Sequence, residues 1–254
     1  MTMGAVLRSE WIKVKTVRST FVTLVVAFFV TVGLSALVSF FTNQNFSKLS
    51  PTERATFDPT QTSLGGVYLG QLAVIVFAVL VIGNEYSTGM IRASLAAVPQ
   101  RGSLLTAKAL IVLGLVLPVS LATSFVSFFL GQALLGSHKA QLSDPGVLRA
   151  VFGSAGYMTL IALFSLGVGF LLRKPVLSLG LLMPFFFLIS PILSNVPKVK
   201  NVAHYFPDRA GSEMAATQAN PNIPFGPGAG FVICLLWVVA ALAVGLALFR
   251  RRDA

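Results

Sequence analysis

The residues whose types could do chemistry gather in one polar stretch near the first third of the chain. The stretch reads Gly83-Asn84-Glu85-Tyr86-Ser87-Thr88-Gly89-Met90-Ile91-Arg92, and it continues to Pro99, Arg101 and Lys108. Glu85 is its only carboxylate, and it is followed by a polar turn and a basic amphipathic segment. Glu85 is held by a partner protein or a nearby arginine, or it faces water in a solvated basic loop.

Other kinds of site find little support in the sequence. A phosphate-binding loop of the form G-x-x-x-x-G-K-[ST] is absent, and residues 131–137 have its glycine spacing without the lysine. His138 and His204 have no second metal ligand near them in sequence, so they are expected to be solvated or interfacial. Cys234 is the only cysteine and can form no intrachain disulfide. We therefore predict no catalytic, cofactor-binding or metal-binding residue in this chain.

The elements that must position the polar stretch are apolar. Of the 254 residues, 55% are hydrophobic and only 11% are charged, which is well below the proportion in soluble domains. Six runs without Asp, Glu, Lys or Arg are long enough to cross a bilayer as helices. We predict an all-α integral membrane protein in which residues 1–254 form a single domain. Its spans are expected at about 19–41, 67–83, 109–130, 151–172, 176–196 and 228–249.

The distribution of Lys and Arg predicts the orientation. The segments before span one, between spans two and three, between spans four and five, and after span six carry twelve of the nineteen basic residues. Because basic residues are retained on the cytoplasmic side, both termini are expected there, in the cell membrane. This topology and anionic lipid account for the net charge of +11, so nucleic acid is not an expected partner.

Two amphipathic segments flank the spans. Before span one, Leu7, Trp11 and Val14 lie in one apolar arc of a helical wheel together with Val6 and Val17, while Lys13 and Lys15 lie outside it. The pattern predicts an interfacial helix, although Glu10 falls inside the apolar arc and Ile12 opposite it. An ordinary basic membrane flank is the alternative.

The second segment lies between spans five and six, on the predicted outer side. The residues Val199, Val202, Ala203 and Phe206 have the i, i+3, i+4, i+7 spacing of a short amphipathic helix within a proline-rich stretch. Such a segment can dip back into the membrane face. A plain external loop is the alternative.

The predicted spans contain no titratable residue of the kind that ion-coupled carriers place near the bilayer centre. Gln71, Tyr157 and scattered Ser and Thr are their polar groups, and these more often serve helix packing. If this chain moves a solute against a gradient, the energy must therefore come from a partner.

The polar stretch resembles the loop between spans two and three of type-two ATP-binding-cassette exporter permeases, a family that includes bacterial drug and antibiotic exporters. That family has E-Y-x-x-G-T-x-R, followed by a proline, an arginine and a lysine before span three. The matching residues are Glu85, Tyr86, Gly89, Arg92, Pro99, Arg101 and Lys108. Met90 departs from the pattern, because it stands where threonine is commoner. The Ser9 to Lys13 opening is similar to the family's interfacial helix.

The resemblance implies a non-enzymatic permease subunit. Two such chains, a homodimer or two related permeases, would form the pathway, and two ATPase subunits would bind ATP and Mg and dock beneath. Residues 85–101 would then act as a coupling helix seated in the ATPase, with Ser87 and Thr88 in its turn. The alternatives are a passive channel, for which the loop is unexplained, and a membrane anchor without transport. The sequence does not identify a substrate.

Overall fold

The computed structural model describes residues 2–16, 18–218 and 223–251, and within these ranges the chain forms helices and no strand. The helices are α1 (Met3–Thr16), α2 (Arg18–Asn45), α3 (Pro51–Ala55), α4 (Pro59–Ser63), α5 (Val67–Ser87), α6 (Met90–Ala97), α7 (Arg101–Leu135), α8 (Val147–Leu172), α9 (Pro175–Pro184), α10 (Ser190–Asn195), α11 (Lys200–Ala203), α12 (Pro207–Glu213) and α13 (Pro227–Arg251). The all-α prediction is confirmed.

Six helical stretches of the described chain are long and apolar enough to cross a membrane, as the sequence predicts. They are α2, α5, α7, α8, the continuous stretch Pro175–Asn195 and α13. In the fifth, a π-helical turn at Phe185–Ile189 joins α9 to α10. Pro184 precedes this turn, and because proline removes one backbone donor the regular ladder of hydrogen bonds is interrupted there.

The helix ends differ from the predicted boundaries where charges begin. Helix α5 continues past residue 83 to Ser87, and α7 begins at Arg101 rather than near residue 109. Most of the segment between predicted spans two and three is therefore helical, and Glu85 and Lys108 lie inside long helices. The backbone hydrogen bonds of these helices continue through the charged residues, whereas the prediction ended each span at its last apolar residue.

Helix α8 forms the centre of the bundle and packs against α5, α7 and α13. Its buried face contributes large side chains such as Met158, Ile161 and Phe170 to the main hydrophobic core. Helices at the periphery instead direct apolar side chains outward: Phe21 of α2 is 71% exposed and Val176 of α9 is 85% exposed. Apolar surface of this kind is matched to lipid rather than to water.

Helices α2 and α5 approach each other closely at Gly70. A Cβ atom at this position would lie 1.8 Å from Oγ1 of Thr31 on α2, so any other residue would force the Thr31 side chain or its helix to move. Small residues permit such close backbone contact between helices in membranes. The N-terminal half of α5 is thereby fixed against α2.

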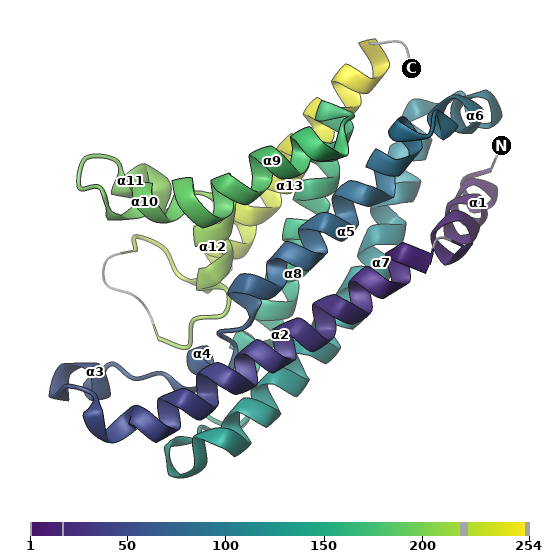
Figure 1. The fold of residues 1–254 in the computed structure, drawn as a ribbon. Coiled ribbons are helices and arrows are strands. Elements are labelled where there is room, and N and C mark those ends of the chain that lie inside the picture. Colours follow the sequence, from purple (N-terminus) through teal and green to yellow (C-terminus); the bar gives the residue numbers. More distant parts are fainter. Residues whose placement is uncertain (1, 17, 219–222, 252–254) are drawn as a thin grey trace.

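The two ends of the bundle are built differently. Helix α1, helix α6 and the C-terminal end of α13 lie together at one end, which we call the terminal end (Figure 1). Helices α3 and α4 lie at the opposite end, where α4 contacts α7 (Figure 1). The polar stretch predicted to do chemistry is therefore located at the terminal end.

Candidate functional site

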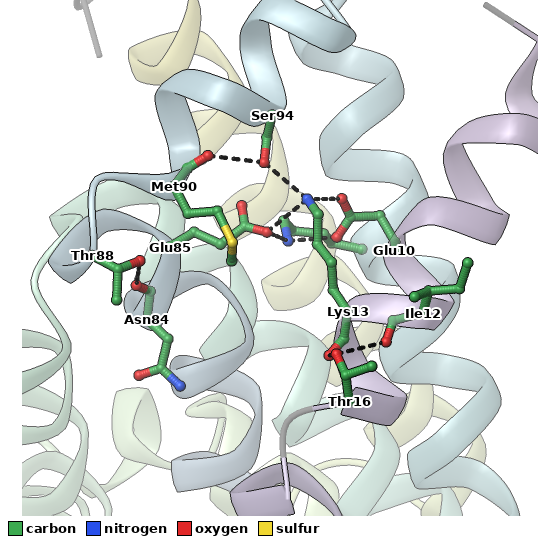
Figure 2. A network of polar contacts seen from close by, with 10 residues as sticks. Glu10, Ile12, Lys13, Thr16, Asn84, Glu85, Thr88, Met90 and Ser94 are labelled. Atoms are coloured by element: carbon green, nitrogen blue, oxygen red, sulfur yellow. Dashed lines mark hydrogen bonds and ion pairs between the residues drawn. The ribbon is translucent and has the colours of Figure 1, made fainter.

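Four charged side chains form a buried cluster at the terminal end, which we call the four-charge cluster: Glu10, Lys13, Glu85 and Lys108. Nζ of Lys108 lies 2.6 Å from Oε2 of Glu10 and 2.8 Å from Oε1 of Glu85. Nζ of Lys13 lies 2.6 Å from Oε1 of Glu10 and 2.9 Å from Oε1 of Glu85. Each lysine thus bridges both carboxylates, and the cluster joins α1, α5 and α7. Figure 2 shows the contacts that Lys13 makes with Glu10 and Glu85.

Lys13 also connects the cluster to α6. Its ammonium donates a hydrogen bond to Oγ of Ser94 at 2.8 Å, and Ser94 in turn donates to the backbone oxygen of Met90 (Figure 2). An ammonium group has three donors, and here the three go to Glu10, Glu85 and Ser94. One side chain of α1 therefore contacts both α5 and α6, which lie more than seventy positions further along the chain.

Burial makes this cluster sensitive to the loss of any member. The side chains of Glu10 and Glu85 are 3% exposed and that of Lys108 is 2% exposed, whereas Lys13 is 25% exposed. Two positive and two negative charges balance, so no net charge is buried. Removing one partner of a buried pair typically costs about 3–5 kcal/mol, because the remaining charge is left without compensation.

The pKa of Lys13 reflects this balance. Burial lowers the pKa, but the hydrogen bonds and charges of Glu10 and Glu85 outweigh burial and raise it above the ordinary value of 10.5. Lys13 therefore stays protonated at physiological pH. Oε2 of Glu85 is also buried and has no hydrogen-bond partner among the described residues.

The backbone turn between α5 and α6 places Glu85 in the last turn of its helix. Both the backbone N–H and the hydroxyl of Thr88 donate to the carbonyl of Asn84, which caps α5. Gly89 then has φ of 72°, in the left-handed region that glycine adopts without strain. The chain thereby leaves α5 and begins α6 within three residues.

The predicted coupling residues separate into a buried base and an exposed tip. Glu85 is buried in the cluster, while Ser87, Thr88, Gly89 and Arg92 are exposed at the turn and the start of α6. Arg92 does not pair with Glu85, so the prediction that a nearby arginine holds this carboxylate is wrong. Two lysines, Lys13 and Lys108, hold it instead. Pro99 is exposed just before α7.

Tyr86 and Arg101 make contacts of a different kind. The guanidinium of Arg173 lies 5.5 Å from the ring centroid of Tyr86. The guanidinium of Arg101 lies 5.5 Å from the ring centroid of Phe249 and donates to the backbone oxygen of that residue. Arg101 therefore connects the start of α7 to the end of α13.

Helix α1 forms where the N-terminal amphipathic helix is predicted. Val6 is buried in a small cluster with Val98 and Ala107, and Leu7 packs against it. Val14 is partly buried, while Trp11 and Lys15 are exposed. Val17 lies outside the described residues. Packing against α6 and α7 thus fixes one face of α1, and the membrane contact of the exposed face stays a prediction.

Sequence reasoning missed that the cluster exists. Glu10 was visible as a carboxylate inside an apolar arc, and Lys108 as a cation beside a span. Both can be buried because their opposite charges form an ion pair with each other. Lys13 was expected on the polar face of α1, but its ammonium points inward to Glu85. Ser94 gave no signal, because an isolated serine in an amphipathic segment has many ordinary roles.

The segment at 199–206 forms a different structure from the single amphipathic helix that was expected. Helix α11 ends at Ala203, and Phe206 has extended backbone as the residue before Pro207, which begins α12. A residue before proline is disfavoured in the helical region, so the i+7 position cannot belong to the same helix. Ala203 is buried, but Val199 and Val202 are exposed, the latter at 66%.

Six apolar spans with a buried ionic cluster at one end define a multi-pass membrane protein whose soluble parts are small. The chain matches a family model described as ABC-2 family transporter protein over residues 6–190, which include most of α1 and all of the four-charge cluster. Since the match covers more than half of the chain, the protein belongs to this family. It is a membrane permease component of an ABC transporter, not itself a catalytic enzyme, and such a system includes an ATPase partner. A comparison with curated proteins finds no match.

Proposed function

We propose that this protein is the permease of an ATP-driven exporter, and that the exposed tip of α6 receives the ATPase while the four-charge cluster transmits its movement. Two permease chains, either identical or related, form the pathway in the cell membrane with both termini in the cytoplasm. Two ATPase subunits bind ATP and Mg. The observation that supports this proposal most directly is that the cluster lies directly behind the exposed Ser87–Arg92 tip and ties it to α1, α5 and α7.

The tip has the properties of a docking element. Ser87, Thr88 and Gly89 are exposed polar or small residues, and Met90 and Arg92 beside them are exposed as well. Behind them, Ile91 and Ser94 are buried and anchor α6 to the bundle. A partner that grips the tip would therefore move α6 together with its neighbours rather than bend a loose loop.

The route from the tip to the spans runs through charge and packing together. Ser94 on α6 accepts a hydrogen bond from Lys13 on α1, so α6 and α1 are linked. Glu85 on α5 pairs with Lys13 and with Lys108 on α7, so α5 and α7 are linked to them. Val6 of α1 packs with Val98 and Ala107 beside this network. Closure of the ATPases would then reach the permease as a rigid-body movement of the four helices.

The experiment compares a variant in the buried cluster, Glu85→Gln, with a variant in the exposed tip, Arg92→Ala. Each measurement is normalised to the amount of protein in the membrane. Glu85→Gln keeps the size of the side chain but removes its charge, so it should retain the ATPase in pull-down while lowering transport-coupled ATP hydrolysis about tenfold or more. Arg92→Ala alters the tip and should weaken ATPase pull-down itself. Lys15→Ala is the matched control, because Lys15 is an exposed cation of α1 outside the cluster.

Two results would contradict the proposal. If Glu85→Gln and Arg92→Ala both behave as Lys15→Ala does, α6 is not the coupling element. If no ATPase is recovered with the wild-type protein and solute moves only down its gradient, the passive channel becomes the better interpretation.

A further inference from the structure

A second polar site lies at the end of the bundle opposite the four-charge cluster. It is a cavity of about 160 Å³ between α12, α8 and the start of α5. Its polar lining includes Tyr68, Ser154, Tyr157, Asp208 and Arg209. Such a volume holds a small polar group rather than a whole drug-sized molecule.

Asp208 is the buried charge of this site. Its side chain is 5% exposed, although it belongs to the connection between two spans. Oδ2 accepts a hydrogen bond from Oγ of Ser190 at 2.5 Å and lies 3.4 Å from Nε of Arg209. Oδ1 is buried and has no hydrogen-bond partner among the described residues, and the same is true of Oγ of Ser154. The site thus has two polar atoms without a partner, Oδ1 of Asp208 and Oγ of Ser154. While Asp208 is ionised, its Oδ1 can accept a hydrogen bond but cannot donate one.

The surroundings favour a ligand that carries both signs of charge. Asp208 and Arg209 are the charged residues among those lining the cavity, and together they are neutral. An ammonium group would satisfy Asp208, and Arg209, whose side chain is 29% exposed, would accept an anionic group at the mouth. The tyrosine rings of the lining suit a cation as well.

The outer wall of the cavity continues into apolar surface. Tyr68 lines the cavity and is 45% exposed, and Leu69 beside it on α5 is 42% exposed. The Tyr68 ring also contacts the ring of Phe187 on the fifth span, with centroids 5.1 Å apart. A polar head in the cavity would therefore have hydrocarbon-facing surface immediately beside it for acyl chains.

We propose that this cavity binds the head of a zwitterionic phospholipid that carries a primary ammonium, of the phosphoethanolamine type. The ammonium donates to Asp208 and Ser154, the phosphate pairs with Arg209, and the acyl chains lie along the exposed side of α5. Burial raises the pKa of Asp208 above the ordinary carboxyl value, and an ammonium partner would offset that cost.

The test uses the purified full-length protein and lipids of equal chain length that differ in head group, with dissociation constants measured by native mass spectrometry. Phosphatidylethanolamine should bind about tenfold tighter than phosphatidylcholine, because the choline ammonium has no N–H to donate to Oδ1. Phosphatidylglycerol, which lacks the ammonium, should bind no better than phosphatidylcholine. Glycerophosphoethanolamine, a soluble head group without chains, should bind more weakly than the lipid if the apolar wall contributes.

Variants assign the preference to residues. Asp208→Asn should lower the affinity for phosphatidylethanolamine about tenfold and remove its advantage over phosphatidylcholine. Arg209→Gln should weaken both lipids, since both carry the phosphate. Glu213→Gln is the matched control, because Glu213 is a buried acid of the same helix that does not line the cavity. Equal affinity of the wild-type protein for the three lipids would overturn the proposal even if Asp208→Asn fails to fold, and so would an unchanged preference in folded Asp208→Asn.

Discussion

The ammonium of Lys108 lies 2.6 Å from a carboxylate oxygen of Glu10, although 98 positions separate the two residues in the sequence. One comes from the short helix before the first span and the other from the third span. Both are almost fully buried. Their pairing explains why each tolerates an apolar environment, and it makes each dependent on the other.

Removing Lys108 should therefore destabilise the protein strongly. Lys108→Ala leaves Glu10 and Glu85 with Lys13 as the cation between them, and we expect a loss of about 3–5 kcal/mol in the free energy of unfolding. Adding Glu10→Gln to this variant restores charge balance and should recover part of the loss. Unfolding in detergent measures both variants, and a loss below about 1 kcal/mol for Lys108→Ala would show that the cluster is solvated.

Gly89 gives a test in which the backbone alone is changed. Its φ of 72° is strained for any residue with a Cβ atom, while nothing lies within 4 Å of where that atom would be. Gly89→Ala should cost about 1–2 kcal/mol through φ alone and lower transport per molecule in the membrane. Gly114→Ala in α7 is the control, because it also has open space but ordinary helical φ, and it should be neutral or stabilising. Equal effects at both positions would exclude a role for the turn.

Alkaline pH should weaken the cluster through Lys13. Its folded-state pKa is raised above the ordinary value of 10.5, so its stabilisation is fully present below that value and is lost as pH rises through the folded pKa. Thermal unfolding measured from about pH 9 to about pH 12 should show this loss. In Lys13→Arg the side chain stays charged, so the alkaline decline should be smaller. A decline of the same size in both proteins would assign it to other groups.

The orientation can be tested with single cysteines in a Cys234→Ala background. Ser47, in the turn after α2, and Ser9, on α1, are both exposed and are expected on opposite sides of the membrane. On intact cells an impermeant thiol reagent should label Ser47→Cys and leave Ser9→Cys unlabelled. If only Ser9→Cys were labelled, the orientation would be the reverse of the predicted one, and α6 would lie outside the cell.

Membrane contact of the segment between spans five and six also has a direct test. Val202 is 66% exposed on α11, so a tryptophan there would report its surroundings without disturbing the core. If the segment dips into the membrane face, brominated lipid should quench Val202→Trp more than Lys200→Trp, with the same native tryptophans present in both. Equal quenching would favour a plain external loop.

The parts of this structure that depend on local sequence were predictable, and those that depend on distant pairing were not. Each span is an apolar run that satisfies its own backbone hydrogen bonds, so six helices follow from the sequence. The predicted span two ends before α5 does and the predicted span three begins after α7 does, because each span was limited to its apolar run. Glu85 and Lys108 lie inside these helices because they form an ion pair between α5 and α7, and no local sequence pattern indicates such a pair.

In the segment between spans five and six the prediction failed for a different reason, because a proline interrupts the helix that the apolar spacing indicates. The spacing at 199–206 fits one amphipathic helix, but Pro207 sets Phe206 to extended backbone and starts α12. The buried acids Asp208 and Glu213 then follow on a helix for which the apolar spacing gave no sign.

The separation of the four charges along the chain also sets an order of assembly. Glu10 and Lys13 leave the ribosome long before Glu85 and Lys108 exist, and until then they can pair with each other or be solvated by water. Helix α1 can take its buried position only after α5 and α7 are both in the bilayer. Its docking is therefore a late event in biogenesis, and a chain arrested before span three would leave this helix accessible to proteases and quality-control factors.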